Sequence, residues 1–578
     1  MLIYQFADPD GKVTKKIYQK PVDIIETYVL DEVVSCLEKV QLAVDKGYYA
    51  AGYLSYEAAP AFDPVFKVKE GSRMPLIWFG IFHEPLEQEI NVNENYSIAN
   101  WQPSVSRHEY NQAINAIRER IKQGDTYQVN YTIRMKSNFT GNSRSFFEKL
   151  AEAQSSNYSA YLDIGDYSIV SASPELFFQL KDQKIKTKPM KGTIKRGMTL
   201  KEDQANAEWL ASSEKNRAEN VMIVDLLRND LGKIAKTGTV KVPKLFEVEK
   251  YPTVHQMTST VTAELKADTK IVDIFHALFP CGSITGAPKV KTMGVISELE
   301  NSPREVYCGA IGYMSPHGEA VFNVAIRTAI IHKQTGAVQY GVGGGITWDS
   351  TAQGEYEEIL TKAEVLKART KEFELLESIR LSDGNPILLD EHLNRMERSA
   401  EYFGFNFTKD TVRDTIREES EKYPIGEYKI RVLADKLCNL SVEFHKMEPI
   451  QSPAHVILAK EPISKENIFL YHKTTNRKVY TEMKQKYPEY FDVLLRNENG
   501  EITEFTTGNI VVELDGQLYT PSTECGLLEG TFREYLLKQG EITEKVITLK
   551  ELKKSSEIWL INSVREWVKV KLNFTNFS

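Results

Sequence analysis

Residues 340–363 read YGVGGGITWDSTAQGEYEEILTKA, and this stretch decides how the fold of the first half of the chain is interpreted. Its glycine tract holds Gly341, Gly343, Gly344 and Gly345, which permit a ligand to approach the backbone closely and can present N–H groups to an anion. A β-bulge or a tight packing turn would use the same glycines. The tract alone therefore leaves a ligand-binding segment and a structural turn as equal alternatives.

Acidic residues follow the glycines. Glu355 and Glu358 lie three positions apart, which puts both carboxylates on one face of a helix, as a hard divalent cation such as Mg²⁺ requires. Glu219, in RAENVMIVDLLRND, is a candidate third ligand from a second helix. Arg327, in the apolar run FNVAIRTAII, is costly to bury unless a carboxylate from a ligand or from the protein pairs with it. Alone, such acidic helix faces are usually just solvated.

The composition limits the class of protein. A chain of 578 residues with 42% hydrophobic and 26% charged residues has ample material for several packed domains, so dominant disorder is excluded. The net charge of -8 comes from interspersed acidic and basic residues, which disfavours nucleic acid and anionic lipid as partners.

The compartment is predicted from the cysteines and the N-terminus. The five cysteines show no CxxC spacing and fit neither a disulfide framework nor a zinc site. The N-terminal MLIYQFADPDGK lacks the apolar run of a signal peptide, and no apolar stretch approaches the ~18 residues that span a bilayer. We expect a soluble, cytoplasmic protein that does not interact with membranes.

The pattern of hydrophobic residues predicts an α+β protein in three parts. Residues 1–106 mix helical periodicity with short alternating runs, and residues 107–367 alternate β-rich runs with charged amphipathic helices. A large antiparallel sheet with helices on its outside accounts for this second part. We place a junction at residues 366–373, and residues 372–578 then contain a strand, a helix and strands with NG and DG hairpin signals.

Ordered blocks between residues 107 and 365 carry a resemblance. They are GDTYQVNYT, SASPELFF, PMKGTIKRG, RAENVMIVDLLRNDLGKI, VHQMTSTVTAEL, FPCGSITGAPKVKTM, YCGAIGYM, VFNVAIRT and the stretch at 340–363. In these blocks the chain resembles the chorismate-utilising enzymes, which include anthranilate, aminodeoxychorismate, isochorismate and salicylate synthases.

The resemblance implies a Mg²⁺-dependent reaction on chorismate, a cyclohexadiene with two carboxylates and a 4-hydroxyl that must leave. By position in the motifs, Glu219, Glu355 and Glu358 would hold Mg²⁺, a Lewis acid for the ring carboxylate. Arg327 and Tyr307 would bind the enolpyruvyl carboxylate. The N–H groups of Gly344 and Gly345 would bind the ring carboxylate together with Lys362. His255 and Thr285 would line the same pocket or be satisfied polar core residues.

Two positions separate the branches of this family. Members that add water carry a lysine base where this sequence has Gln128, and an amide cannot take a proton from water at neutral pH, so the nucleophile is expected to be ammonia. Anthranilate synthases carry a small residue in the PxxGT motif, whereas PMKGT supplies Lys191, as in aminodeoxychorismate synthases. The implied mechanism is covalent, with Lys191 as the nucleophile and Glu175 as the proton donor. The first half has no glutaminase signature, which implies a separate glutamine amidotransferase subunit.

The second half resembles the fold-type IV pyridoxal-phosphate (PLP) enzymes, a group that holds branched-chain and D-amino-acid aminotransferases and aminodeoxychorismate lyases. The matching blocks are FELLESIRL, LDEHLNRMERSA, HKTTNR, ITEFTTGNIVV, LYTPSTECGLLEGTFREYLL and IWLINSVREWVKV. The resemblance implies Lys473 as the Schiff-base lysine and Glu504 as the partner of the pyridinium. It places the phosphate near Arg395, Thr531, Phe532 and Ser563, and it leaves Arg565 and Arg477 as alternatives for the substrate carboxylate.

The two halves together predict a bifunctional enzyme that makes p-aminobenzoate from chorismate for folate synthesis. One alternative is an anthranilate synthase component followed by an unrelated PLP aminotransferase. Another is a synthase with a non-catalytic C-terminal module for dimerisation. Because fold-type IV sites usually lie near a dimer interface, we expect a homodimer through the C-terminal half.

Overall fold

The computed structural model describes residues 1–8, 11–86, 94–364, 366 and 372–574. The chain divides into two compact units, which are described separately. The first comprises residues 1–195 and 206–370, and the second comprises residues 196–205 and 371–578. Most of the predicted junction at residues 366–373 lies outside the described residues.

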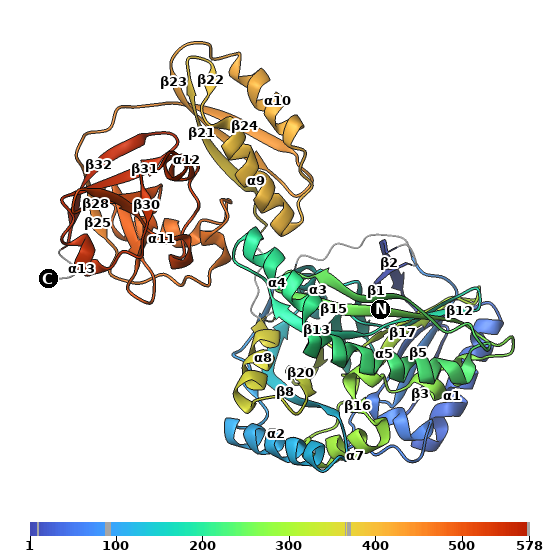
Figure 1. Cartoon of the computed structure of the whole chain (residues 1–578). Helices are drawn as coiled ribbons and strands as arrows, with labels where there is room; N and C mark the ends of the chain where they lie inside the picture. The colour runs from blue at the N-terminus through green and yellow to red at the C-terminus, as the bar shows by residue number, and fades with distance from the viewer. Residues whose placement is uncertain (9–10, 87–93, 365, 367–371, 575–578) are drawn as a thin grey trace. The chain divides into compact units, whose positions relative to one another are not determined.

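The first unit contains two ten-stranded sheets in which all strand pairs are antiparallel among the described residues (Figure 1). The first sheet has the order β16 (Gly286–Ala287), β8 (Gln128–Gly141), β20 (Ala337–Ile346), β19 (Thr328–His332), β10 (Tyr167–Ser173), β9 (Tyr158–Asp163), β1 (Leu2–Ala7) and β2 (Val13–Tyr18), and β6 (Tyr96–Ile98) and β7 (Gln102–Pro103) pair with β8. The second has the order β13 (Met190–Lys195), β15 (Val254–Glu264), β12 (Lys184–Lys188), β11 (Leu176–Lys181), β18 (Ala320–Val324), β17 (Ala310–Met314), β4 (Tyr49–Leu54), β5 (Ile77–Phe82) and β3 (Asp23–Thr27), and β14 (Lys241–Lys250) pairs with β15. Strands of residues 1–106 therefore enter both sheets.

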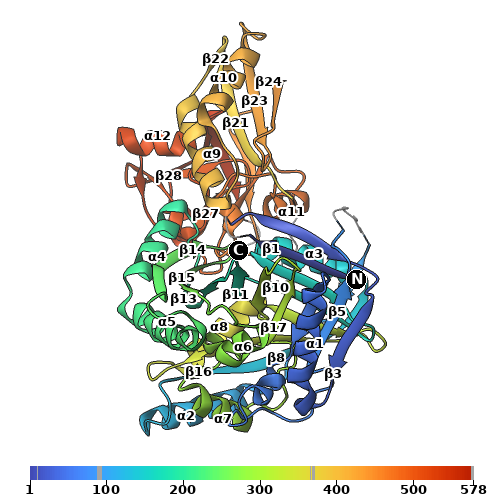
Figure 2. The same ribbon diagram turned by 90° about the vertical axis from the view of Figure 1, so that its right-hand side faces the viewer.

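The core of this unit has three layers of apolar side chains. An aromatic-rich cluster with Tyr4, Phe6, Tyr53 and Tyr313 takes side chains from both sheets and fills the space between them. A second cluster joins the second sheet to α1 (Val33–Asp45), α5 (Glu214–Ile234) and α6 (Ile271–Leu278). A third joins the first sheet to α2 (Arg107–Lys122), α3 (Ser143–Gln154), α7 (Lys289–Leu299) and α8 (Ala352–Glu364). The helices thus cover the outer faces of the sheets, as Figure 2 shows for α1 beside β3 and β5.

Local signals explain where these elements begin. Ser106 and Glu109 form a capping box at the start of α2, in which the N–H of Glu109 donates to Ser106 Oγ at 3.2 Å and the N–H of Ser106 donates to Glu109 Oε2 at 2.7 Å.

The glycine tract forms no turn, because β20 pairs with β8 from Ala337 to Ile346 without a register shift. The glycines therefore lie in a regular strand.

The second unit has a small and a large part. In the small part, a four-stranded sheet with the order β22 (Asn385–Pro386), β21 (Leu375–Ser382), β23 (Glu427–Ala434) and β24 (Leu440–Lys446) packs against α9 (Leu389–Phe403) and α10 (Lys409–Ser420). The large part is a sheet with the order β27 (Ile502–Phe505), β26 (Asp492–Arg496), β25 (Ala454–Leu458), β32 (Glu566–Asn573), β31 (Glu557–Asn562), β28 (Asn509–Leu514), β29 (Gln517–Thr520) and β30 (Thr543–Glu544). The remaining α-helices of this unit are α11 (Lys478–Lys486), α12 (Thr531–Gln539) and α13 (Leu549–Leu552), and the division between the units falls within α4 (Leu200–Ser212).

The large sheet closes on itself. Because β27 also pairs with β28, six strands form a closed barrel around apolar residues such as Val456, Phe505 and Leu560. The predicted DG turn joins β28 to β29, and Asp515 and Gly516 both have positive φ, as a two-residue hairpin turn of type I′ requires.

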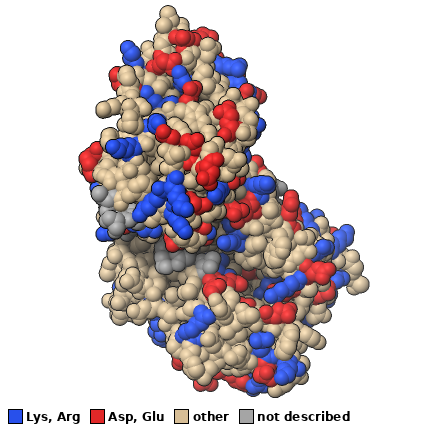
Figure 3. Space-filling view, turned by 60° about the vertical axis from the view of Figure 1, so that its left-hand side comes forward, with Lys and Arg blue, Asp and Glu red and all other residues tan. Residues whose placement is uncertain are grey.

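The predicted fold class is confirmed: both units are α+β, and the first has antiparallel sheets with outer helices. The antiparallel strands of the first unit form two large sheets. Among the described residues, no helix is both long and apolar enough to cross a membrane. Lys and Arg side chains lie among Asp and Glu side chains on the face in Figure 3, in agreement with the interspersed charges of the sequence.

Candidate active sites

A cavity of about 400 Å³ in the first unit collects most of the residues predicted for the first half. Its walls come from β8, β13, β20, α5 and α8 and from the segments around Glu175 and Tyr307. The predicted residues that line it are Gln128, Glu175, Lys191, Glu219, Tyr307, Arg327, Gly344, Gly345, Glu355, Glu358 and Lys362. Segments from Gln128 to Lys362 thus meet at one place.

Lys191 lies in a bulge of β13. The register with β15 shifts between Met190 and Thr193: these two residues are three positions apart on β13, but their partners Thr258 and Gln256 are only two positions apart on β15. Gly192 takes a φ of +97°, a left-handed conformation that suits glycine. The PMKGT motif therefore breaks the regular alternation of the strand at the residue that lines the cavity.

Burial changes the acidity of two groups in this cavity. It raises the pKa of Glu175 to about 7, against the opposing effects of Ser283 and Lys191. It also lowers the pKa of Lys191, although Glu219 and Glu175 counteract this shift. Burial thus shifts the carboxyl toward its protonated form and the amine toward its neutral form, which suits a proton donor beside a nucleophile.

Gln128 is a buried polar side chain without hydrogen-bond partners among the described residues. It is 1% exposed, and neither its amide nitrogen nor its oxygen has a hydrogen-bond partner in the described part of the chain. A Cβ placed on Gly345 would lie 2.0 Å from Gln128 Nε2 and 3.1 Å from Lys191 Nζ. Gly345 must therefore lack a side chain for the Gln128 amide and the Lys191 amine to occupy the space beside the strand.

The backbone of β20 faces the cavity at alternate residues. The carbonyl of Gly343 accepts a hydrogen bond from Lys362 Nζ at 2.8 Å, so Gly343 faces away from β8. Because backbone groups alternate in an unshifted antiparallel ladder, Gly344 faces β8 and Gly345 faces away. The N–H of Asn130, opposite Gly345, accordingly donates to a carbonyl outside β20 at 2.8 Å. Of the two predicted N–H donors, only Gly345 is directed away from the sheet.

Three carboxylates line the same cavity. A Cβ on Gly344 would lie 3.1 Å from Glu355 Oε2 and 3.5 Å from Glu358 Oε1, so both carboxylates lie over this glycine. Burial raises the pKa of Glu219 and of Glu355, which indicates that their negative charge is poorly compensated. Lys362 lowers the pKa of Glu358, with which it forms an ion pair at 2.5 Å.

These carboxylates suit a hard cation in their chemistry, because oxygen donors with uncompensated charge are what Mg²⁺ selects. No three His, Cys, Asp or Glu side chains in the described ranges already form a ready metal centre. The three carboxylates are therefore suitable oxygen ligands for Mg²⁺, but their side chains would have to move closer together to bind it.

Arg327 and Tyr307 form another wall. Arg327 has a φ of +52° between β18 and β19, and its guanidinium donates to the carbonyl of Lys362 at 3.1 Å. The ring of Tyr307 lies against the backbone of β20, because a Cβ on Gly341 would approach it to 2.3 Å. The sequence suggested a carboxylate partner for the half-buried Arg327, and the hydrogen bond that the structure provides is to a carbonyl.

Two predicted residues do not line this cavity. His255 is buried on β15 opposite Ile194, and Thr285 Oγ1 donates to the carbonyls of Cys281 and Gly282 at 3.2 Å each. Sequence reasoning missed the lining residues Asn130, Ser283, Gln256, Lys215 and Thr193. Four of them stand one or two positions from a predicted residue, and Lys215 stands four positions before Glu219; this proximity is the only signal that pointed to them.

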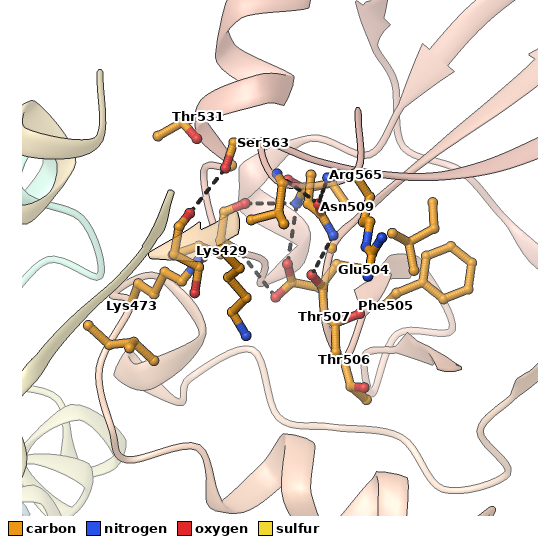
Figure 4. A pocket seen from close by; sticks show the side chains of 18 of the residues that line it. Lys429, Lys473, Glu504, Phe505, Thr506, Thr507, Asn509, Thr531, Ser563 and Arg565 are labelled. Carbon is orange, nitrogen blue, oxygen red and sulfur yellow. Dashed lines mark hydrogen bonds between the residues drawn. The ribbon is translucent and has the colours of Figure 1, made fainter. Parts of the chain in front are cut away.

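A second cavity, of about 580 Å³, lies in the second unit (Figure 4). Lys473, Glu504, Arg395, Thr531 and Ser563, all predicted from the sequence, line it. The side chain of Phe532 does not. It packs near Tyr535 and Trp567, so its predicted contribution is limited to its backbone N–H.

Glu504 is held by three donors at the end of β27. Tyr480 Oη donates to Oε1 at 2.6 Å, the N–H of Leu528 donates to Oε1 at 3.2 Å, and Asn509 Nδ2 donates to Oε2 at 3.2 Å. Burial nevertheless raises the pKa of Glu504 to about 7. A cationic partner would lower this pKa, so the site favours a positively charged ring nitrogen.

Arg395 belongs to a buried network centred on Glu377. Its Nε and a terminal nitrogen donate to the two oxygens of Glu377 at 2.8 and 2.7 Å. His392 Nδ1 lies 2.6 Å from the same carboxylate, and its Nε2 lies 3.3 Å from Thr531 Oγ1. Although burial favours the neutral acid, Arg395, His392 and Lys473 hold the pKa of Glu377 well below its ordinary range. Glu377 therefore organises both Arg395 and Thr531, and the sequence gave no sign of it.

The start of α12 supplies further donors. The N–H of Glu534 is the first in the helix to find a carbonyl, that of Gly530, so Thr531 and Phe532 present N–H groups without helical partners. Such a helix terminus favours an anion. Ser563 Oγ donates to the carbonyl of Ser378 at 3.3 Å and completes this side of the cavity.

Family models match both units. Residues 91–368 match the model of chorismate binding enzymes, and residues 374–572 match that of class IV aminotransferases. The chain joins a chorismate-binding domain to a class IV aminotransferase domain. The order of the two predicted halves and the family of each are thereby confirmed.

Relatives cover the chorismate-binding domain. Aminodeoxychorismate synthase component 1 of Salmonella typhimurium is 43% identical over 262 residues, which are 45% of this chain and 57% of that protein. Anthranilate synthase component 1 of Aquifex aeolicus is 38% identical over 275 residues, 48% of this chain and 55% of that protein. The crystal structure of anthranilate synthase component I from Streptococcus pneumoniae superimposes with a TM-score of 0.55 at 28% identity, over 61% of this chain and 92% of that one. The chain spans less than two thirds of the length of these curated relatives.

A class IV aminotransferase domain implies PLP, and the second cavity fits it. Burial lowers the pKa of Lys473 to about 7, so a neutral amine is available to bind an aldehyde. Glu504 can accept a ring N–H, and Arg395 with the start of α12 can bind a phosphate. Amine, acid and anion donors therefore line one cavity.

We expect Glu377→Gln to weaken PLP binding by roughly ten- to hundredfold, the usual effect of losing a hydrogen bond to a charged group. The amide would leave Arg395 without its anionic partner and disturb the contact of His392 with Thr531. Titration of the apoprotein with PLP, followed by visible absorbance, measures the affinity. Glu397→Gln, at an exposed position of α9, the helix that carries Arg395, serves as the control. Equal affinities in both variants would contradict the role of Glu377.

Proposed function

We propose that this chain makes p-aminobenzoate from chorismate in two steps. The chorismate-binding domain would replace the 4-hydroxyl with ammonia to form 4-amino-4-deoxychorismate, and the class IV domain would eliminate pyruvate from it. The observation that carries the proposal is the placement of the Lys191 amine and the Gln128 amide over Gly345 in one cavity. The Lys191 amine can add to the substrate as a nucleophile, whereas the Gln128 amide cannot activate water.

In the amination step, the neutral Lys191 amine attacks C2 of chorismate while the double bond shifts and the 4-hydroxyl leaves with a proton from Glu175. Ammonia then attacks C4 and expels the lysine, so nitrogen ends at C4. Arg327 binds the enolpyruvyl carboxylate beside Tyr307, and Gly345 N–H with Lys362 binds the ring carboxylate. When bound by Glu219, Glu355 and Glu358, Mg²⁺ supplies Lewis-acid stabilisation of that carboxylate.

In the elimination step, bound PLP supplies an electron sink for the carbon that carries the amine. Glu504 keeps the ring nitrogen protonated, and Arg395 with the start of α12 anchors the phosphate. Lys473, as a neutral amine, would remove the proton from C4 of the substrate ring, the carbon that carries the amine. The enolpyruvyl oxygen then leaves as the ring becomes aromatic, which provides the driving force.

Two partners complete the proposal. Ammonia would come from a separate glutamine amidotransferase subunit, in keeping with the absence of a glutaminase signature from the sequence. Two copies of the chain would associate through the class IV domain.

The proposal is tested by incubating the protein with chorismate, Mg²⁺ and ammonium, with and without PLP, and identifying the products by chromatography. We expect p-aminobenzoate and pyruvate with PLP, and mainly 4-amino-4-deoxychorismate without it. Omission of Mg²⁺ should stop both. Anthranilate as the product would refute the assignment of the first step, and 4-amino-4-deoxychorismate that persists with PLP would refute that of the second.

A further inference from the structure

The second cavity contains many more cations than anions. Among its described lining residues the only carboxylate is that of Glu504, whereas Arg395, Lys429, Arg431, Lys446, Arg477 and Arg565 contribute positive charge. Two of these have carboxylate partners nearby, since Arg395 pairs with Glu377 and Arg431 pairs with Glu443. The remaining excess of positive charge suits anions from bound molecules.

Lys429 is the clearest case. The side chain of this half-buried residue of β23 forms neither a hydrogen bond nor an ion pair with any described residue. Its cross-strand neighbours are Arg380 on β21 and His445 on β24, so basic side chains stand on either side. Burial lowers the pKa of Lys429, and Arg431, Arg477 and Arg565 lower it further. A lysine among cations, without a counter-ion, indicates a place for an anionic ligand.

Arg477 and Arg565 satisfy hydrogen bonds without neutralising charge. Arg477 donates to the carbonyl of Thr506 at 2.5 Å and stacks on the ring of Tyr480, whose centroid lies 4.3 Å away. Arg565 donates to the carbonyl of Glu448 at 2.5 Å. Each guanidinium retains further N–H groups for an anion. Figure 4 shows Arg565, Lys429 and Lys473 around the same cavity.

The phosphate of PLP accounts for only part of this charge, because its donors are Arg395 and the start of α12. We propose that Lys429, Arg477 and Arg565 form a binding site for a substrate with two carboxylates, and that Lys429 determines the preference for such a dianion. The inference rests on the proposed function and deepens it: 4-amino-4-deoxychorismate has two carboxylates. An amino acid with an apolar side chain has one, and would leave a cation unpaired in the cavity.

A stable dianion tests this site without turnover. We would measure binding of 4-amino-3-(carboxymethoxy)benzoate to the PLP-loaded protein by calorimetry, with its uncharged dimethyl ester as the control ligand. Lys429→Gln should weaken binding of the dianion roughly ten- to hundredfold, as expected for a charged hydrogen bond, and leave binding of the ester unchanged. Lys429→Arg should restore most of the affinity, and Lys436→Gln, at an exposed loop position, should bind like the wild type.

Unchanged binding of the dianion in a folded, PLP-loaded Lys429→Gln protein would overturn the inference, as would equal affinity of the wild type for dianion and ester. If the dianion site behaves as expected but the wild type releases no p-aminobenzoate from 4-amino-4-deoxychorismate, the proposed function fails and the dianion site stands. If p-aminobenzoate forms but Lys429→Gln binds the dianion normally, the inference about Lys429 fails and the proposed function stands. Lys429→Arg keeps the test decisive should Lys429→Gln fail to fold.

Discussion

Lys191→Ala is expected to lower the rate of 4-amino-4-deoxychorismate formation by about a thousandfold or more, since loss of a covalent nucleophile removes a whole reaction step. The amine is buried, and the bulge in β13 places it over Gly345 beside the Gln128 amide. Each other described group that lines this cavity would remain in the variant, so chorismate should still bind. Chromatography of the products at saturating ammonium measures the rate.

Lys195→Ala is the matched control, because Lys195 is an exposed residue of the same strand. It should retain the wild-type rate. Near-wild-type output from Lys191→Ala would exclude the covalent route. The identity of the product adds a second criterion. The alanine would give the PxxGT motif the small residue that anthranilate synthases carry, so any residual aromatic product should be examined for an amine at C2.

The pH profile of the wild type gives an independent check. The proposed step needs Glu175 protonated, and burial raises its pKa to about 7, so the rate should fall as the pH rises through 7 and this proton is lost. Lys191 must be neutral, so the rate should also fall toward acid pH, where the amine is protonated. Glu175→Gln should remove the alkaline decline.

Lys473→Ala is expected to abolish p-aminobenzoate formation, by about a thousandfold or more, while the chorismate-binding domain continues to work. Lys473 lines the cavity together with Glu504 and Thr531 at the start of α12, and it is assigned two tasks, attachment of the cofactor and transfer of the substrate proton. The intermediate 4-amino-4-deoxychorismate should therefore accumulate. Pyruvate release and product chromatography report the two steps separately.

Lys478→Ala, at an exposed position of α11, should behave like the wild type. Attachment of PLP provides a further readout. Because burial lowers the pKa of Lys473 to about 7, the rate of attachment should rise as the pH passes through 7, well below the ~10.4 of a free lysine. p-Aminobenzoate from the Lys473→Ala protein would show that another amine serves the reaction.

The sequence predicted those parts of the fold and sites that depend on local patterns. The periodicity of the amphipathic segments predicted helices, and the DG pair predicted a hairpin. The candidate residues of the first half rested on motif blocks, and eleven of them line one cavity.

What the sequence did not predict depends on partners that are distant along the chain. The glycine tract proved to be a regular strand because β8, some 200 residues earlier, supplies its ladder, and the same register turns the N–H of Gly344 into the sheet. The roles of Glu377 and Lys429 were missed for a related reason. The alternation of polar and apolar residues along a strand predicts on which face of the sheet a side chain lies, but not which residues or cavities lie next to that face. His255 and Thr285 stand in the right blocks, yet pack behind the cavity wall.

The closure of the barrel constrains how the class IV domain can be made in the cell. Strand β32 lies between β25 and β31, and Ala454 pairs in parallel with Val570, so the ring of strands is incomplete until the last strand has left the ribosome. During synthesis the edges of β25 and β31 would stay open, and open edges invite pairing with other chains. We therefore expect a nascent class IV domain to depend on chaperones during the interval before residue 573 emerges, and to gain its cofactor only afterwards.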